Sequence, residues 1–425
     1  MNLRLAWTIT GIVALMLLAG SVYLAVRQRG LAETAQPAGM VEAVVESTQS
    51  DTDQAIASPP QALGNARNGL IAFVSDRDGN DEIYVMQPDG SDQLRITENE
   101  GMDENPFWPS DGSRLIWTRI EDTNDNGVFG DSTDTVSVHS ATPDGGDRQL
   151  IMQKRGGWVE SGGHSQDFTR AAIFFIEDSD ENNERNENDQ AQLLLFNPNE
   201  ADLEPVDLLA GRAGISISQA QSNLAILFSN DGNTLFLALD GEDGQGMYAF
   251  ALDGGPPELL IEGTILDSAL SPDGSQLAVF REIEDTGRRR RRLIIYELET
   301  GRDTTMLMGG LGFEFLTRMS WHPDGNRLIF MGGTGNSAPD IYSLDIADDE
   351  LTNLSQRVAD PAFVPVWSPD GRQAAFVSQH YTASGRGFVP DGDMLIHLVD
   401  DLGSATTQIT EDQGNNSQPA WQPVY

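Results

Sequence analysis

The sequence predicts an all-β protein folded as a seven-bladed β-propeller, with six blades as the alternative. Three observations predict this fold. A Trp-Ser-Pro-Asp-Gly-like turn recurs along the chain, short apolar segments flank each turn, and the two ends of 66–425 carry complementary parts of one repeat. The 425 residues include 43 Gly and 20 Pro, which suits a chain with many turns. Repeats of about 40–50 residues that each contain four short strands are typical of propeller blades.

The clearest repeat unit begins with the turn Trp367–Gly371 and continues through the apolar segment Gln373–Ser378. Glycine fits this turn because it adopts positive φ without steric cost. Further on, each unit has a strand centred on a pair such as Ile341-Tyr342, then a second glycine turn and a fourth strand. Turn glycines equivalent to Gly371 are Gly112, Gly232, Gly274 and Gly325. In the long gap after Gly112, a degenerate copy carries Phe168 at the glycine position.

The two ends of the repeat region predict ring closure. Ile71–Ser75 corresponds to the second strand of a unit, and no first strand precedes it. The C-terminal segment Pro419–Pro423 corresponds to a first strand and has no second strand after it. We therefore expect the C-terminal strand to complete the first blade, which removes two exposed sheet edges. Seven units result, and six would require 158–211 to be an insertion.

The N-terminal segment is predicted to lie outside the propeller. Leu5–Val26 is apolar and uncharged, and about 22 helical residues span about 33 Å, enough to cross a membrane. We interpret 1–29 as a transmembrane signal anchor. A cleaved signal peptide, which would give a secreted protein, is the alternative. Residues 30–65 are rich in Ala, Gln, Ser, Thr, Pro and Glu and predict a flexible linker to the propeller domain at 66–425.

Charge and cysteine content exclude several classes of function. Lys and Arg number 26 against 66 Asp and Glu, giving a net charge of −40. Nucleic acid is an unsuitable partner, because binding to phosphates requires clustered cations. The absence of Cys excludes disulfides, thiolate metal sites and a cysteine nucleophile. Together with the N-terminal segment, this acidic composition predicts a propeller outside the cytoplasm, in the periplasm or at the cell surface.

The repeat resembles the TolB-type propeller repeat, which also occurs in the propellers of prolyl oligopeptidase-like peptidases. The shared pattern is Trp-Ser-Pro-Asp-Gly, then Ala-Phe, Ile-Tyr, Gly and Leu-Thr, and it extends over about 360 residues. The resemblance implies a propeller and a binding role. TolB has an α/β domain before its propeller, where this chain has the predicted anchor and linker. No Gly-x-Ser-x-Gly motif is present, so the peptidase activity of the other relatives is not implied.

Loop lengths predict that one face of the ring carries the function. Connections from strand one to two and from three to four emerge on one face, which we call the short-turn face. Connections from two to three and from four to one emerge on the other, which we call the long-loop face. Nearly all length variation falls in the two-to-three connections: 121–134, 177–190, 282–292, 332–340 and 380–393. Long loops on a rigid scaffold commonly carry binding sites.

One of these connections matches the first half of a calcium-binding loop. It reads Asp-x-Asn-x-Asn-Gly, with Asp122, Asn124 and Asn126 at alternating positions. Thr133 occupies the twelfth position, so Asp131 or Asp134 would supply the closing ligand. Ca²⁺ is therefore the one cofactor that the sequence suggests, and a solvated acidic loop is the alternative. The connection 178–183 in the next unit is a weaker candidate, because it lacks the glycine.

The connection at 282–292 contains the one basic cluster of the chain. It consists of Arg288, Arg289, Arg290, Arg291 and Arg292. These residues are candidates for contact with an acidic protein, an anionic cell-envelope polymer or lipid headgroups. Neutralisation of nearby acidic groups is the alternative. The five histidines show no metal-binding spacing, and we expect the repeated tryptophans to form the core between blades.

These observations predict a non-catalytic, membrane-anchored propeller that acts as a scaffold for a protein or cell-envelope partner. A structural subunit of a larger envelope complex is one alternative. The other is a hydrolase or lactonase with a metal in the central channel, which would require carboxylates and histidines that converge there.

Overall fold

The computed structural model describes residues 68–184, 189–199, 205–210, 225–241, 244–285, 288–310, 312–334, 337–384, 387–411 and 413–423. The predicted anchor and linker lie outside these residues. Within them, no helix has the length and apolar character needed to cross a membrane.

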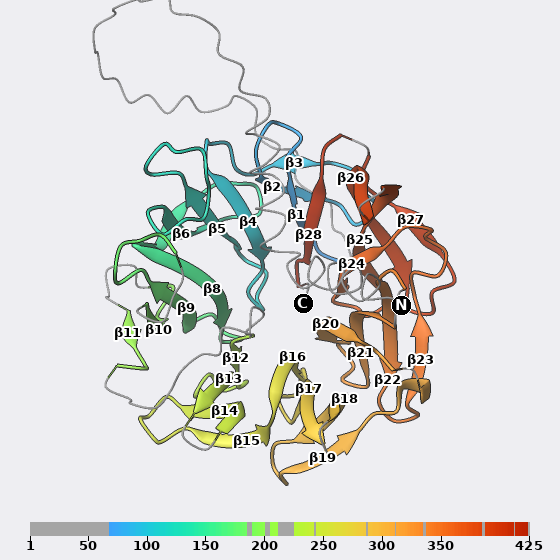
Figure 1. Ribbon diagram of the computed structural model, residues 1–425. Coiled ribbons are helices and arrows are strands. Elements are labelled where there is room, and N and C mark those ends of the chain that lie inside the picture. The colour runs from blue at the N-terminus through green and yellow to red at the C-terminus, as the bar shows by residue number, and fades with distance from the viewer. Residues whose placement is uncertain are drawn as a thin grey trace, which may run out of the picture.

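The described chain forms seven four-stranded antiparallel sheets arranged around an axis (Figure 1). Their strands, from innermost to outermost, are β28 (Asn416–Trp421), β1 (Ile71–Ser75), β2 (Glu82–Met86) and β3 (Leu94–Arg95) in blade 1; β4 (Met102–Phe107), β5 (Leu115–Glu121), β6 (Thr135–Ala141) and β7 (Gln149–Arg155) in blade 2; β8 (Gly157–His164), β9 (Ala171–Glu177), β10 (Gln190–Phe196) and β11 (Val206–Asp207) in blade 3; β12 (Leu227–Phe228), β13 (Thr234–Gly241), β14 (Gly244–Ala251) and β15 (Glu258–Glu262) in blade 4; β16 (Thr264–Leu270), β17 (Gln276–Asp285), β18 (Arg288–Glu297) and β19 (Arg302–Thr305) in blade 5; β20 (Phe315–Trp321), β21 (Arg327–Gly333), β22 (Asp340–Asp345) and β23 (Glu350–Asn353) in blade 6; and β24 (Ala362–Trp367), β25 (Gln373–Ser384), β26 (Gly387–Asp400) and β27 (Thr406–Gln408) in blade 7. The prediction of seven blades is confirmed.

Closure of the ring by the C-terminal strand is also confirmed. β28 pairs antiparallel with β1, with Trp421 opposite Ile71 and Asn416 opposite Ser75. Side chains fix this junction as well. The Asp76 carboxylate accepts hydrogen bonds from the Asn415 backbone N–H at 2.7 Å and from the Asn415 side-chain amide at 2.9 Å. The first blade is thus assembled from both ends of the repeat region.

The repeated Ser-Pro-Asp-Gly turns share one hydrogen-bonding scheme. In blade 7, the Ser368 hydroxyl donates to Asp370 at 2.8 Å and accepts the Gln373 N–H at 3.1 Å. Gly371 has a φ of 71° and its N–H donates to the Ser368 carbonyl at 2.9 Å. The same serine–aspartate pairing recurs at Ser165, Ser229 and Ser271. This local scheme explains why the motif repeats.

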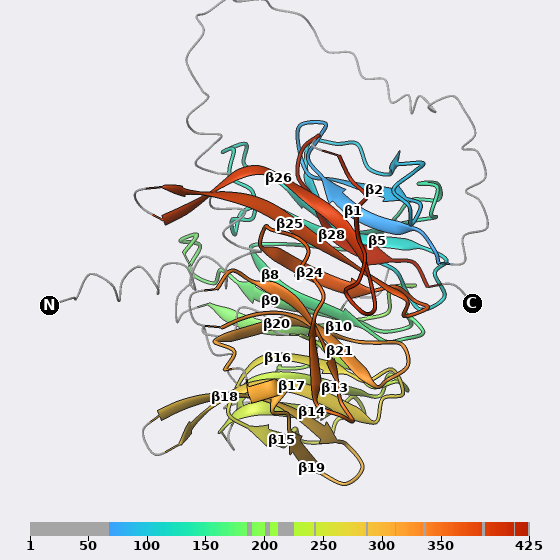
Figure 2. The ribbon, with the colours of Figure 1, turned by 90° about the vertical axis from the view of Figure 1, so that its right-hand side faces the viewer.

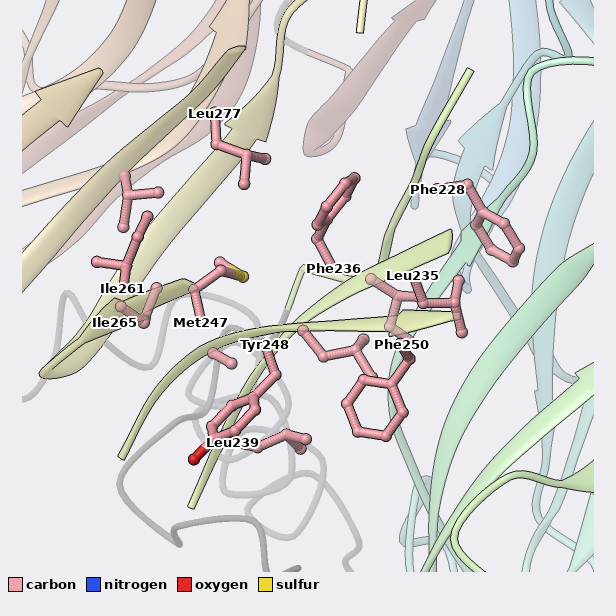
Figure 3. Packing of buried hydrophobic residues seen from close by; sticks show 14 of the residues in the cluster. Phe228, Leu235, Phe236, Leu239, Met247, Tyr248, Phe250, Ile261, Ile265 and Leu277 are labelled. Carbon is pink, nitrogen blue, oxygen red and sulfur yellow. The ribbon is translucent and has the colours of Figure 1, made fainter. Parts of the chain in front are cut away.

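The 157–207 unit is a blade although its turn lacks glycine. Phe168 replaces the glycine and adopts its left-handed conformation, with a φ of 53°. Its ring is buried and packs against Phe107 and His164, so tertiary contacts offset the local strain. Blade 3 also shares a hydrophobic core with blades 4 and 5, in which Phe236, Met247 and Tyr248 are buried (Figure 3). The six-blade alternative is therefore wrong.

The repeated tryptophans lie between blades, as expected. The Trp321 indole N–H donates to the Ala269 carbonyl of the preceding blade at 3.1 Å, and Trp108 makes the equivalent bond to Ala420 at 3.3 Å. Trp421 packs in one cluster with residues of blade 7. These side chains therefore join neighbouring blades.

The two faces of the ring differ strongly. On the long-loop face, the hairpins β17–β18 and β25–β26 extend well beyond their blades on the same side of the ring (Figure 2).

The described chain begins on the short-turn face, where the Asn68 amide lies 3.0 Å from the Asp370 carboxylate. Leu70 and Gln422 exchange hydrogen bonds there as well.

Candidate functional site

Two neighbouring loops on the long-loop face form the candidate cation site. The first joins β5 to β6 in blade 2, and the second joins β9 to β10 in blade 3. Both are rich in Asp and Asn, and each follows a strand whose first residues are apolar and buried. Carboxylate and amide oxygens are the ligands that Ca²⁺ prefers.

In the first loop, the predicted ligands curl the backbone. Asp122 accepts the N–H groups of Asn126 at 3.1 Å and Gly127 at 2.7 Å. Asn124 accepts the N–H of Asn126 at 2.9 Å, and Asn126 accepts that of Val128 at 2.7 Å. Gly127 has a φ of 76°, which the tight turn requires. The alternating oxygens thus lie on the inner side of a compact loop.

The two candidate closing residues of this loop differ from each other. Asp131 is buried. Burial favours its neutral form, but hydrogen bonds from Thr133 and Asn126 outweigh this effect and hold its pKa below the usual value. Asp134 is fully buried, and burial raises its pKa. Its carboxylate accepts the N–H groups of Gly130 at 2.7 Å and Thr123 at 3.2 Å, which anchors both ends of the loop. Asp131 is therefore better placed than Asp134 to face an ion.

The second loop brings three carboxylates together. One oxygen each of Asp178, Asp180 and Asp189 lies within 4.8 Å of the other two, a spacing that could hold a metal ion. Among the described residues, this is the only trio of His, Asp or Glu side chains with that spacing. Burial of Asp178 favours its neutral form, but hydrogen bonds from Ser132 and the Asn183 and Asn182 N–H groups hold its pKa below the usual value. The Asp178 carboxylate is therefore ionised at neutral pH.

The two loops are joined through Ser132. Its backbone N–H donates to the Asn183 side-chain oxygen at 2.8 Å, and its hydroxyl donates to the Asp178 carboxylate. Ser132 is itself buried. A change in the position of Asp178 would therefore be transmitted to the segment between Asp131 and Asp134.

Asp189 is the member that we did not anticipate from the sequence. It lies twelve residues along a loop that begins at Asp178, and Asp180 and Asn182 occupy its third and fifth positions. This spacing matches the ligand positions of a twelve-residue calcium loop. The signal was therefore present, but the missing glycine obscured it.

The basic cluster lies in a strand rather than in a loop. Arg288–Arg292 belongs to β18 and pairs with the acidic end of β17, Arg291 lying opposite Glu282 and Arg289 opposite Glu284. The Arg291 Nε donates to Glu282 at 2.9 Å, and Arg289 lies 3.4 Å from the same carboxylate. Acids of the same hairpin thus neutralise part of the cluster. The side chain of Arg289 remains 80% exposed, so a partner could still reach it.

Four of the five described histidines are buried or half-buried, whereas His380 is exposed and its Nδ1 lies 2.6 Å from the Asp360 carboxylate. His322 is buried between blades 6 and 7, with its Nε2 2.8 Å from the Gly371 carbonyl. His164 stacks on Phe107 with 4.6 Å between ring centroids. His139 and His397 lie on third strands. None of the five is part of the carboxylate trio.

Near the axis of the ring, Asp267 of β16 is buried at the junction with blade 6. Its carboxylate accepts the Ser268 N–H at 2.8 Å and the Met319 N–H at 2.9 Å. Burial raises the pKa of Asp267 to about 6, although these hydrogen bonds and the charge of Arg318 oppose that shift.

This pKa predicts a specific pH dependence of stability. Between pH 4 and pH 6 the folded protein binds more protons at Asp267 than the unfolded chain does. The contribution of Asp267 to the free energy of unfolding therefore falls by about 3 kcal/mol as the pH rises through this window. The Asp267→Asn variant should lack this component, as measured by urea unfolding at pH 4, 5, 6 and 7. Parallel curves for the variant and the wild type would contradict the prediction.

Comparisons with known proteins support the fold. No family model and no curated protein matches the sequence. An oligogalacturonate lyase from Vibrio parahaemolyticus is 15% identical with a TM-score of 0.57, covering 78% of this chain and 86% of the lyase. A manganese complex of oligogalacturonate lyase is 14% identical with a TM-score of 0.58, covering 77% and 85%.

TolB from Acinetobacter baumannii is also similar, with 15% identity, a TM-score of 0.45 and coverage of 84% of this chain and 67% of TolB. Similar structures thus include both a TolB protein and enzymes. At these identities the likeness concerns the fold: the chain is a seven-bladed β-propeller of the kind that its TolB-type repeat predicts.

Proposed function

We propose that this protein is a non-catalytic, membrane-anchored scaffold outside the cytoplasm that binds a protein or another cell-envelope partner through its long-loop face. The observation that carries the proposal is the contrast between the two faces. One face consists of short, similar turns, whereas the other bears two projecting hairpins and two acidic loops (Figure 2). Binding residues commonly lie on such loops.

Single cysteines can test this proposal because the natural chain contains none. Glu284→Cys on the β17–β18 hairpin and Thr123→Cys in the first acidic loop would carry a benzophenone maleimide for photocrosslinking. Asp253→Cys on the short-turn face is the matched control, since all three side chains are exposed. We expect the same partner to crosslink from the first two positions and not from the third. Equal crosslinking from all three would contradict the proposal.

Location can be tested with the same variants. A membrane-impermeant maleimide should label Cys introduced at position 253 or 284 in intact spheroplasts. Labelling only after lysis would place the propeller in the cytoplasm. Retention of the full-length chain in the carbonate-washed membrane fraction would support an anchor, and release into the medium would support cleavage and secretion.

The enzymatic alternative makes a different structural demand. A hydrolase or lactonase with a channel metal requires metal ligands that converge at the axis. Within the described residues, the trio suited to a metal lies instead in the β9–β10 loop.

The other alternative, a structural subunit of an envelope complex, would use the same long-loop face as the scaffold. Stoichiometric co-purification of the partner from membranes would distinguish it from transient binding.

We propose Ca²⁺ as the ion for the two acidic loops. Asp178, Asp180 and Asp189 supply the carboxylates in the second loop, and Asp122, Asn124, Asn126 and Asp131 supply oxygens in the first. Ca²⁺ suits these sites because it accepts six to eight oxygen ligands in irregular geometry. A bound ion would also stabilise the loops by neutralising their clustered negative charges.

Calorimetric titration of the full chain with CaCl₂ tests this assignment. We expect the Asp189→Asn variant to lose binding in the second loop, with at least a tenfold rise in Kd, and Asp122→Asn to affect the first loop. Asp253→Asn, which removes a charge from the short-turn face, should leave the titration unchanged. The absence of heat at millimolar Ca²⁺, or equal titrations for all variants, would refute the calcium proposal.

A further inference from the structure

Arg318 occupies an unusual position on the innermost strand of blade 6. It lies in the middle of β20, which pairs with β21 on one edge and faces the axis of the ring with the other (Figure 1). Its neighbours Thr317 and Met319 are buried, whereas Arg318 is exposed. The Arg318 side chain is therefore open to solvent although it belongs to the innermost strand of its blade.

The backbone of Arg318 adopts a strained conformation at a bulge in the innermost strand of its blade. Its φ is 58°, and the register with β21 shifts between Thr317 and Ser320. Equivalent bulges occur three residues before the tryptophan in blades 1, 2 and 7, at Gln418, Asn105 and Val364. Left-handed φ is costly for residues other than Gly, Asn and Asp. Of these four positions, only that of Arg318 carries a charge.

Neighbouring blades hold this conformation. Asp267 of blade 5 accepts the Met319 N–H, which immediately follows the bulge, at 2.9 Å. In blade 2, the Asn105 N–H donates to the Gln418 side chain of blade 1 at 2.5 Å. The backbone position of Arg318 is thus defined by the assembled ring and does not depend on a loop.

Arg318 is the only Lys or Arg on the seven innermost strands. Among the acids on the same set of strands, Asp103 is bound by Arg119 and Trp117. Asp267 accepts two backbone N–H groups and is also stabilised in its charged form by Arg318. Glu104 of β4 is half-buried. Within the described residues, no carboxylate forms an ion pair with Arg318. The guanidinium therefore keeps all five of its N–H donors available.

We propose that Arg318 is the centre of a carboxylate-binding site on the axis of the propeller. A planar guanidinium binds a carboxylate through two parallel hydrogen bonds. The amides of Asn105 and Gln418 occupy the equivalent positions in blades 2 and 1. This site is separate from the acidic loops and does not rest on the scaffold proposal. The carboxylate could belong to a peptide or to a free small acid, and both sources share this chemistry.

The absence of cysteine allows a direct measurement of the charge at the axis. Val364→Cys places one thiol at the equivalent position of the adjacent strand β24. We would compare its reaction rates with an anionic and a cationic methanethiosulfonate reagent at low ionic strength. One positive charge about 10 Å away should favour the anionic reagent about tenfold. The Arg318→Gln variant should lose this preference, and Arg318→Lys should retain it.

Controls keep the result interpretable. Asp253→Cys places the thiol in the β14–β15 turn on the short-turn face instead of on an innermost strand. There, adding Arg318→Gln should leave the ratio of the two reaction rates unchanged. Gln418→Cys provides a second reporter if the variant at Val364 folds poorly, with thermal melts showing which variants are folded. A rate ratio at the axis that does not respond to Arg318→Gln would overturn the proposal.

Competition then identifies the source of the carboxylate. The probes are acetate and an amidated Gly/Ser heptapeptide with one central Glu, and the same peptide with Gln is the blank. Protection of the thiol by the Glu peptide alone supports a peptide ligand, and equal protection by acetate supports a free acid. Both effects should disappear in Arg318→Gln. Protection by neither probe, or by the Gln peptide equally, would overturn the proposal.

Discussion

Deleting β28 by ending the chain at Asn415 is expected to abolish cooperative folding of the propeller. β28 is the innermost strand of blade 1, and its removal leaves one edge of β1 unpaired. It also removes Trp421 from the cluster that contains Ala375, Val377 and Ile396 of blade 7. The junction that closes the ring would be lost as a whole. Circular dichroism during thermal unfolding should show no cooperative transition.

Ending the chain at Pro423 is the matched control and should melt like the full chain, because β28 and the Gln422 contacts with Leu70 and Gly112 remain. The Trp421→Ala variant should lie between the two, with a loss of about 3–5 kcal/mol. A synthetic peptide spanning 415–423 should restore the transition of the deletion variant. A normal transition without the peptide would show that closure does not depend on β28.

The Asp103→Ala variant is expected to lower the unfolding free energy by about 3–5 kcal/mol, because it leaves buried polar groups and a charge without their partner. Asp103 is fully buried. Its carboxylate accepts the Trp117 indole N–H at 3.0 Å and the Arg119 Nε at 2.8 Å. The side chain of Arg119 is only 17% exposed, so water cannot fully replace the lost partner. Urea unfolding at pH 7 measures the change.

The ion pair of Asp303 and Arg281 supplies a matched control. Its atoms are 3.5 Å apart and the Asp303 side chain is 49% exposed. Asp303→Ala should therefore cost less than about 1 kcal/mol. Asp103→Asn retains an acceptor and should fall between the two alanine variants. Similar small losses for both alanine variants would show that burial does not set the strength of the Asp103 contacts.

The features predicted correctly from sequence are those that local chemistry determines. A glycine after Pro-Asp forces a tight turn, as Gly371 shows, and an apolar strand without a partner at each end predicts closure. Blade 3 was harder to recognise, because Phe168 reaches positive φ only with the support of Phe107 and His164. The contact with Phe107, which is distant in the sequence, leaves no local pattern.

In the candidate sites, too, the features set by local sequence were predicted and those set by tertiary contacts were not. The spacing of Asp122, Asn124 and Asn126 identified the first acidic loop, whereas the link through Ser132 to Asp178 depends on the packing of two blades. The arginine run was expected in a loop, because five like charges rarely form a strand. Opposing acids such as Glu282 allow β18 to continue through it. Arg318 could not be singled out from sequence, since nothing in its local pattern predicts a left-handed residue.

The position of Asn68 on the short-turn face has a consequence for how the protein would be oriented in the cell. An anchor and linker at 1–65 would attach the propeller by the side opposite its hairpins and acidic loops. A flexible linker of about 36 residues has a root-mean-square span of about 30–35 Å, similar to the thickness of a bilayer. The ring would then be held close to the membrane, with its hairpins directed outward to reach targets beyond the lipid surface.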